Sequence, residues 1–408
     1  METQRKKMET DGVKKVRGIL VIKPRFIYRP LYGTIIIDPI THTKYILQKV
    51  IGACENHFIY KARYYTVDGP ANKSLLPSGY ATVKFIRPTQ EVCQSQEVEA
   101  SIPNSNIIHV SNWHIRNFKE GFLVAMPYMS EGSLRYILAT RFKNGLPEDC
   151  IAIALKQALL GLSDLHNSGR VHQRFSVGNI YVNFIPRPIS NVEIRLGFAV
   201  TIYKSDLEPY IFFGEGKLPD GQPEQKYLPR HDLQSNSDLS APPEVFYKKY
   251  DDNLNPVKSP LFKDYDEVHT VKSDIWLVGI AALELAYGNL RISNRKEFEA
   301  LIKKIKRSKR LPDKLEDLIE EIHVVKGKGK MKKAVGYFND KLKVVKGKRS
   351  KKFSEEFEEL VLDCLSSKES KRPTVKDLLE RPFFQNAKAL KWFQRRVLYA
   401  KDPIIADV

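Results

Sequence analysis

The sequence predicts an α+β protein in two parts, a small β-rich part followed by a larger helical part. Between Tyr45 and Val124 the chain consists of short runs rich in β-branched and aromatic residues with breaks between them, which is typical of a sheet. From Ser133 onward, apolar residues recur at the three- and four-residue spacing of a helix face. The length of 408 residues suffices for one large two-lobed domain or two ordinary domains.

The individual elements follow this order along the chain. Strands are expected over 32–38 and at the runs YILQKVI, FIYKARYY and YATVKFI, with one helix over 91–101 between them and the next runs. The second part contains a predicted helix over 151–165 and two short strands between 180 and 198. Further helices are expected at 272–287, 295–307, 354–365 and 374–380.

Composition excludes several classes of protein. With 42% hydrophobic and 28% charged residues, the chain has the composition of a globular protein and not of a disordered or fibrous one. The longest apolar stretch, 275–286, contains Glu284 and is too short to cross a bilayer. Residues 1–17 are basic but lack the apolar core of a secretory signal. The four cysteines lie far apart without a CxxC pair, which favours a reducing compartment, the cytoplasm or the nucleus.

The net charge of +19 is concentrated in one segment. Residues 326–352 contain twelve Lys and Arg against one acid, Asp340, and therefore carry +11, which leaves +8 for the rest of the chain. Two Lys/Gly-rich copies, at 324–333 and 344–352, bury too little to build a core, so we expect a flexible insertion. It is either a solvated tether or a binding site for a polyanion or an acidic partner.

Five segments, in chain order, resemble the signature set of protein kinases. They are MPYMSEGSL (126–134, the hinge), HNSGRVHQRFSVGN (166–179, the catalytic loop), APPEV (241–245, the APE motif), SDIWLVGIAALELAYG (273–288, the central helix) and CLSSKESKRPTVKDLLERPFF (364–384, the final helices). Together they resemble the Sterile-20 group, nearest the plant Fray-like Ser/Thr kinases, over about 45–387.

This resemblance implies a bilobal protein-kinase fold with a small β-rich N-lobe and a larger helical C-lobe. The implied division is an N-terminal extension over 1–40, an N-lobe over 41–125, a C-lobe over 126–387 and a C-terminal tail over 388–408. The Lys/Gly-rich insertion at 324–352 falls inside the C-lobe, in a region where kinases vary in length.

Part of the nucleotide site is kept, according to the resemblance. Lys84 in YATVKFI stands where the kinase lysine grips the α- and β-phosphates, and Glu97 is its expected partner. Met126 and Met129 occupy the hinge. The alternative is that Lys84 and Glu97 form a structural ion pair without nucleotide.

The phosphate-covering loop is degraded. The family pattern GxGxxG falls on Gly52, Cys54 and His57, so the first glycine alone remains. Side chains at the second and third positions hinder the close approach of the backbone to phosphates.

The catalytic base is missing. The family motif HRD reads here His172-Gln173-Arg174, and arginine does not accept a proton near neutral pH. Ser176 stands where the family lysine steadies the γ-phosphate. Asn179, the family's second metal ligand, remains, and shaping the loop by hydrogen bonds is its alternative role.

The metal-binding aspartate is missing as well. The equivalent of the DFG motif falls at Leu196 or at 197–199, and no aspartate occurs between Asn179 and Asp206. Glu193 is on the strand before the motif. Because Mg²⁺ prefers carboxylate and phosphate oxygens in octahedral geometry, we expect no metal, no required cofactor, and at most weak ATP binding without Mg²⁺.

The structural positions of the family are retained by contrast. The resemblance implies that Asp274 holds the backbone of the catalytic loop, and that Glu244 and Arg372 anchor the activation segment as an ion pair. A pseudokinase that acts as scaffold or allosteric regulator of an active kinase is the leading hypothesis. A divergent Ser/Thr kinase that uses Glu193 and His172, and an adaptor that binds polyanions through 326–352, are the alternatives.

Overall fold

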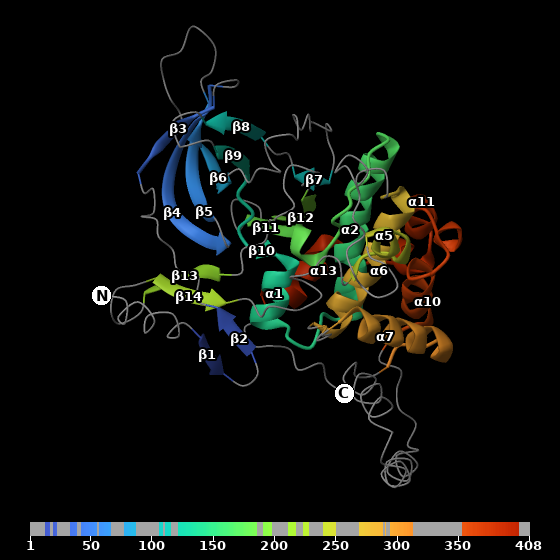
Figure 1. Ribbon diagram of the computed structural model, residues 1–408. Coiled ribbons are helices and arrows are strands. Elements are labelled where there is room, and N and C mark those ends of the chain that lie inside the picture. The colour runs from blue at the N-terminus through green and yellow to red at the C-terminus, as the bar shows by residue number, and fades with distance from the viewer. Residues whose placement is uncertain are drawn as a thin grey trace. The chain divides into compact units, whose positions relative to one another are not determined.

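The structure is a computed structural model that describes residues 13–16, 19–22, 33–38, 42–54, 57–66, 77–86, 106–108, 111–115, 121–185, 191–197, 211–217, 223–227, 240–249, 269–288, 290, 294–312 and 353–399. They fall into two compact units, one of strands and one mainly of helices, so the predicted α+β class is confirmed (Figure 1). The helix expected over 91–101 and the Lys/Gly-rich insertion lie outside the described residues.

The first unit is an antiparallel sheet with the order β14-β13-β4-β5-β6-β9-β8, and β3 pairs with β4. Its strands are β3 (Ile35–Ile37), β4 (Lys44–Cys54), β5 (His57–Tyr65), β6 (Pro77–Ile86), β8 (Ser111–Ile115), β9 (Gly121–Pro127), β13 (Ile211–Lys217) and β14 (Pro223–Tyr227). The first four of them coincide with the four runs predicted as strands. Successive side chains of a strand point to opposite faces. Alternate residues such as Tyr45, Leu47 and Val83 therefore gather in one core.

Strand β4 has different neighbours along its two halves. Its N-terminal half pairs with β3, where Ile35 faces Ile46, and its C-terminal half pairs with β13, where Phe212 faces Gly52. The predicted boundary between the N-terminal extension (1–40) and the N-lobe (41–125) therefore separates β3 from the sheet to which it belongs. A separate hairpin of β1 (Val13–Val16) and β2 (Ile19–Ile22) precedes β3.

The second unit is built around two long helices, α2 (Glu148–Asn167) and α6 (Val271–Tyr287). A small sheet has the order β10-β11-β12-β7, with β7 (Ile107–Ile108), β10 (Gly132–Ser133), β11 (Ile180–Ile185) and β12 (Asn191–Gly197). The remaining helices are α1 (Leu134–Arg141), α5 (Pro243–Lys249), α7 (Arg295–Ser308), α10 (Glu355–Cys364), α11 (Val375–Leu379), α12 (Pro382–Gln385) and α13 (Leu390–Phe393). Short 3₁₀ turns span Val177–Asn179 and Glu369–Lys371.

Helix α6 is the centre of the second unit, because its residues from Ser273 to Tyr287 are all buried. It starts at a capping box in which Thr270 and Ser273 satisfy each other's backbone N–H groups. Gly145 packs so close to its C-terminal end that an added Cβ would lie 2.0 Å from the carbonyl oxygen of Ala286, and its φ of +96° also favours glycine. None of the described helices has both the length and the apolar character of a membrane span.

The first part of the predicted C-terminal tail (388–408) is packed against the core of the second unit. Helix α13 continues into one turn of π-helix (Gln394–Leu398), and the side chains of Phe393 and Val397 are fully buried in the core of the second unit. Trp392 Nε1 donates a hydrogen bond of 2.5 Å to Asp149 Oδ2 at the start of α2. The boundary predicted at 387 is therefore too early, because an apolar pair one turn apart docks this helix on the core.

Replacing Phe393 by alanine tests this docking. Removing a fully buried aromatic ring leaves a cavity, so we expect the free energy of unfolding to fall by about 3–5 kcal/mol. Chemical denaturation followed by circular dichroism measures it. The exposed neighbour Lys391, replaced by alanine, is the control and should change stability by less than about 0.5 kcal/mol. Equal stability of the two variants would show that the helix is not part of the core.

Candidate functional site

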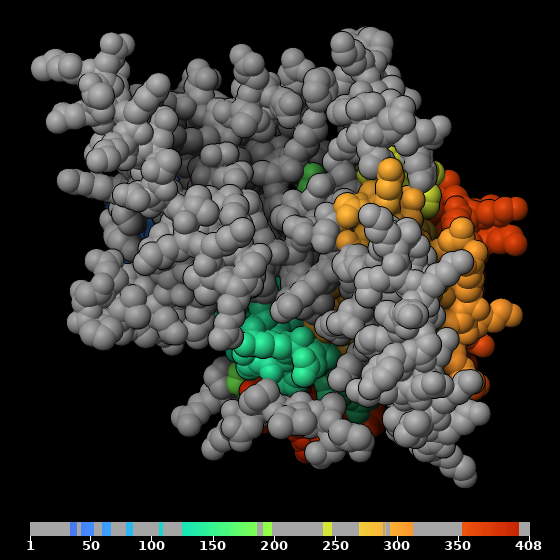
Figure 2. All heavy atoms as spheres, turned by 60° about the horizontal axis from the view of Figure 1, so that its bottom comes forward, coloured from blue at the N-terminus to red at the C-terminus, as the bar shows by residue number. Residues whose placement is uncertain are grey.

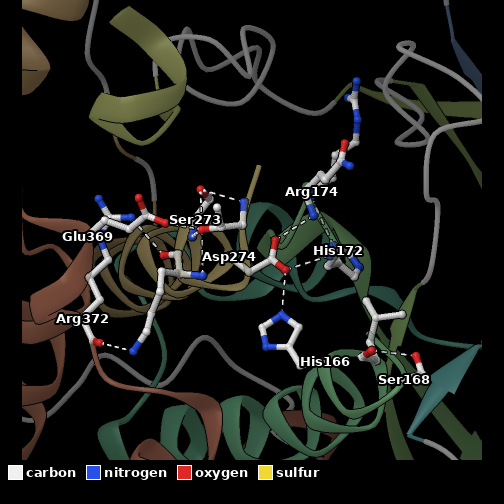
Figure 3. A network of polar contacts seen from close by, with 12 residues as sticks. His166, Ser168, His172, Arg174, Ser273, Asp274, Glu369 and Arg372 are labelled. Atoms are coloured by element: carbon white, nitrogen blue, oxygen red, sulfur yellow. Dashed lines mark hydrogen bonds and ion pairs between the residues drawn. The ribbon is translucent and has the colours of Figure 1, made fainter. Parts of the chain in front are cut away.

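The buried carboxylate of Asp274, in the first turn of α6, organises the loop that contains the predicted catalytic motif (Figure 3). Its Oδ2 accepts hydrogen bonds from the backbone N–H of His172 at 2.7 Å and from His166 Nε2 at 2.8 Å. Its Oδ1 accepts from the backbone N–H of Gln173 at 2.7 Å. A buried charge needs such partners to offset its lost hydration.

Gln173 adopts a left-handed backbone conformation, with φ of +64°. This conformation is unfavourable for a residue with a Cβ atom and costs about 1 kcal/mol or more. It lets two successive N–H groups, those of His172 and Gln173, converge on the two oxygens of Asp274. The loop is therefore held in one geometry by the charge beneath it.

His172 is buried in its neutral form. Its Nδ1 accepts a hydrogen bond from the backbone N–H of Arg174 at 3.2 Å, so its Nε2 carries the proton and donates to the carbonyl oxygen of Gly197 at 2.7 Å. Burial lowers the pKa of His172, in agreement with an uncharged ring. The ring joins the catalytic loop to the end of β12 and has no nitrogen left for proton transfer.

Arg174 and Asn179 fill the remaining positions of the motif. The side chain of Arg174 points away from the Asp274 carboxylate in Figure 3, so the position of the family's base presents a guanidinium. Asn179 Nδ2 donates a hydrogen bond to the carbonyl oxygen of Arg174 at 2.8 Å. The asparagine thus shapes the loop, which is the alternative role that the sequence offered.

Among the described residues around this loop, none offers a free carboxylate to a magnesium ion, and positions 198–199 of the predicted metal motif lie outside the described residues. Gly197, at the end of β12, uses its carbonyl oxygen to bind His172, and Leu196 is an apolar core residue. Glu193, on the same strand, lies 3.4 Å from Arg195 in an ion pair. Within the described ranges, no group of three His, Cys, Asp or Glu side chains could hold a metal.

The predicted nucleotide residues are placed in separate parts of the structure. In the first unit, Lys84 is fully buried on β6, Met126 is half-buried on β9, and Gly52 is buried on β4. Met129 is buried in the second unit, directly after the hinge strand. Glu97 lies outside the described residues, so its pairing with Lys84 stays a prediction.

Glu244 and Arg372 form a bidentate ion pair. The guanidinium donates from Nη1 to Oε1 at 2.7 Å and from Nη2 to Oε2 at 2.8 Å. Ser273 Oγ donates to the same Oε1 at 3.0 Å, so the pair is tied to the N-terminal turn of α6. Arg372 is fully buried, and it also donates to the carbonyl oxygens of Ser366 and Lys272.

Sequence reasoning missed several residues that complete this framework. His166 is the third donor to Asp274, and its six-residue spacing before His172 inside one motif was the available signal. A second buried ion pair joins Arg135 on α1 to Glu284 on α6, with Nε and Oε1 at 2.9 Å. The interruption of the apolar run of α6 by Glu284 was a signal for this pair, since a buried carboxylate requires a cation.

Comparisons with known proteins find a kinase and kinase adapters among the similar sequences. The serine/threonine-protein kinase fray2 of Dictyostelium discoideum is 25% identical over 288 residues, which are 70% of this chain and 21% of the kinase. The human STE20-related kinase adapter protein beta is 24% identical over 68% of this chain and 60% of the adapter. The chicken STE20-related kinase adapter protein alpha is 23% identical over 76% of this chain and 75% of the adapter. No protein-family model matches the sequence.

Breaking the Glu244–Arg372 pair should strongly destabilise the protein. Arg372→Ala leaves the Glu244 carboxylate without its cation, so we expect a loss of about 3–5 kcal/mol in the free energy of unfolding. Arg381→Ala is the matched control, because it breaks the more exposed pair with Asp363 and should cost less than about 1 kcal/mol. An Arg372→Ala variant as stable as the control would contradict the anchoring role.

The Glu244–Arg372 pair should make the free energy of unfolding depend on pH in the acidic range. Burial raises the pKa of Glu244, but the hydrogen bonds and charge of Arg372 outweigh burial and hold the pKa below its usual 4.5. The contribution of a carboxylate with a lowered pKa is present above pH 4.5 and is lost as the pH falls through the folded-state value. The difference in stability between the parent and Glu244→Gln should therefore shrink between about pH 6 and about pH 3. A difference that stays constant would contradict this assignment.

Proposed function

We propose that this chain is a Sterile-20-related, kinase-like protein, a pseudokinase that regulates a signalling kinase by binding it. It serves as a scaffold or an allosteric regulator, and it needs no phosphoryl transfer of its own. One observation carries this proposal. The loop of the catalytic motif is fully supported by Asp274 and His172, although its base position is Arg174 and its metal position has no carboxylate.

The contrast between support and chemistry argues for binding. Kinases lower the barrier to phosphoryl transfer by positioning and by cancelling charge with metal ions and cationic side chains. Losing the base alone reduces the rate by about a hundredfold to ten-thousandfold. The support of the loop nevertheless still depends on a buried charge and on the strained backbone of Gln173. These features maintain a surface of defined shape, which a protein partner requires.

The alternative of a divergent active kinase finds little support in the site. It would rely on Glu193 and His172, but Glu193 is paired with Arg195. Both ring nitrogens of His172 are engaged with backbone groups, and burial lowers its pKa. Neither side chain is placed to replace the missing aspartates.

The names of two of the relatives describe kinase adapters, and they guide the proposal of a partner. The chain spans about three fifths of the human adapter. That the whole function of the adapter applies to this chain is therefore a proposal. We infer that the partner is an active protein kinase. The widely spaced cysteines of this chain favour a reducing compartment, the cytoplasm or the nucleus.

Nucleotide is an optional ligand in this proposal. The buried Lys84 and the hinge methionines would hold ATP weakly, and no residue of the described site would hold its metal. The Lys/Gly-rich segment 326–352 would add a contact to polyanions, because it carries +11 of the net charge.

A nucleotide titration tests the proposal. A site with a Kd of about 100 μM would stabilise the protein by roughly 1.4 kcal/mol at about 1 mM ATP, and we expect the same shift in melting temperature with and without Mg²⁺. Purified protein should transfer no more phosphate to a generic substrate than its Lys84→Met variant. A shift that requires Mg²⁺, or transfer that Lys84→Met abolishes, would favour the active kinase instead.

A further inference from the structure

The C-terminal end of α7 carries an unusual density of positive charge. Six cations gather there and on the adjoining turn before α11, and we call them the basic α7 surface: Lys306, Arg307, Lys309, Arg310, Lys368 and Lys371. The two segments touch, because Lys306 Nζ donates a hydrogen bond to Ser367 Oγ at 2.8 Å. Figure 2 shows side chains of α7, in orange, standing out from the surface beside the red-orange segment that starts at Phe353.

These cations lack carboxylate partners among the residues that the structure describes. Several surface cations elsewhere in the second unit are paired: Arg141 with Glu131, Arg381 with Asp363, and Lys388 with Asp149. The acid nearest in sequence, Glu369, accepts a hydrogen bond from the hydroxyl of Thr270. The last carbonyls of a helix attract one or two cations, but their effect fades within one turn and does not account for six.

Lys306 marks the centre of this surface. Its ammonium is half-buried, lies 5.8 Å from the centroid of the Trp276 ring, and has the Ser367 hydroxyl as its hydrogen-bond acceptor. Burial, and after it the nearby guanidinium of Arg372, lower the pKa of Lys306 to about 8. An anion placed beside this ammonium would restore the charge compensation that burial removes.

The surface fits one class of anionic partner better than others. The large apolar residues of α7, Phe298, Leu301, Ile302 and Ile305, are all buried, so this helix has no large apolar side chain available to enter a membrane. Trp276, the aromatic ring beneath Lys306, is also buried, and stacking of nucleobases needs an accessible ring. Carboxylate or phosphate groups on a polypeptide need neither feature.

We propose that the basic α7 surface is a docking site for an acidic segment of a protein partner. This inference rests on the proposed function, in which the chain acts by binding a protein, and it adds the chemistry of the partner's contact. The acidic side chains would lie along the end of α7, and one of them would reach the Lys306 ammonium. Specificity would come from the pattern of charge, as it does at electrostatically steered interfaces.

Fluorescence anisotropy with a labelled glutamate-rich peptide tests the site on the full chain. The α7 variant combines Arg307→Glu, Arg310→Glu, Lys368→Glu and Lys371→Glu. The control variant combines Lys143→Glu, Lys391→Glu, Arg395→Glu and Arg396→Glu, which are also exposed and make the same change in net charge. We expect the α7 variant to bind the peptide at least about tenfold more weakly than the parent and the control to stay within about threefold. Unchanged far-ultraviolet circular dichroism would show that both variants fold.

Three further arms identify the ligand class. A variant with 326–352 replaced by a Gly/Ser linker should keep its affinity for the peptide, because the site lies on α7. Lys306→Met should lower the affinity for the peptide without lowering the melting temperature of the protein. A single-stranded uridine oligonucleotide and phosphatidylserine vesicles should bind the α7 variant and the control equally.

The outcomes separate this inference from the proposed function. Equal loss of peptide affinity in the α7 and control variants, or a loss confined to the linker variant, would overturn the α7 site. If the α7 variant alone loses affinity for the oligonucleotide or for the vesicles, the ligand of the surface is a nucleic acid or a membrane and not an acidic polypeptide. None of these measurements involves phosphoryl transfer, so the docking site and the absence of catalysis can each fail alone.

Discussion

The buried carboxylate of Asp274 is the interaction on which the rest of the second unit depends. It draws in two backbone N–H groups of the catalytic-loop motif and one histidine ring, all within 2.8 Å. One residue earlier, Ser273 binds the Glu244–Arg372 pair. The first turn of α6 therefore contacts the loop, helix α5 with Glu244 of the APE motif, and Arg372 before the final helices.

This arrangement separates the support of the loop from the side chains at its motif positions. The donors to Asp274 are mostly backbone groups, so they do not depend on which side chains occupy positions 173 and 174. An arginine can replace the base without disturbing the support beneath it. The residues that support the loop and the residues at its motif positions are thus separate sets here.

Much of the fold could be predicted from the sequence, because periodicity reports which face of an element is buried. The helix expected over 151–165 is the interior of α2, and that expected over 295–307 matches α7 to one residue. The pairing of β13 with β4 was not predictable, since the two strands lie about 160 residues apart and neither carries a signal for its neighbour. At the site, motifs located Asp274, whereas the tautomer of His172 depends on the carbonyl of Gly197, to which no motif points.

The position of Phe393 and Val397 in the core affects how the chain matures during synthesis. Protein chains emerge from the ribosome from the N-terminus, and domains usually fold as their residues become available. Here these two apolar side chains belong to the helix that packs against α2, and they are among the last described residues of the unit to emerge. Until then the start of α2 exposes the surface that α13 covers. The helical unit therefore exposes this apolar surface while most of its residues are being translated. During that interval the surface is accessible to chaperones.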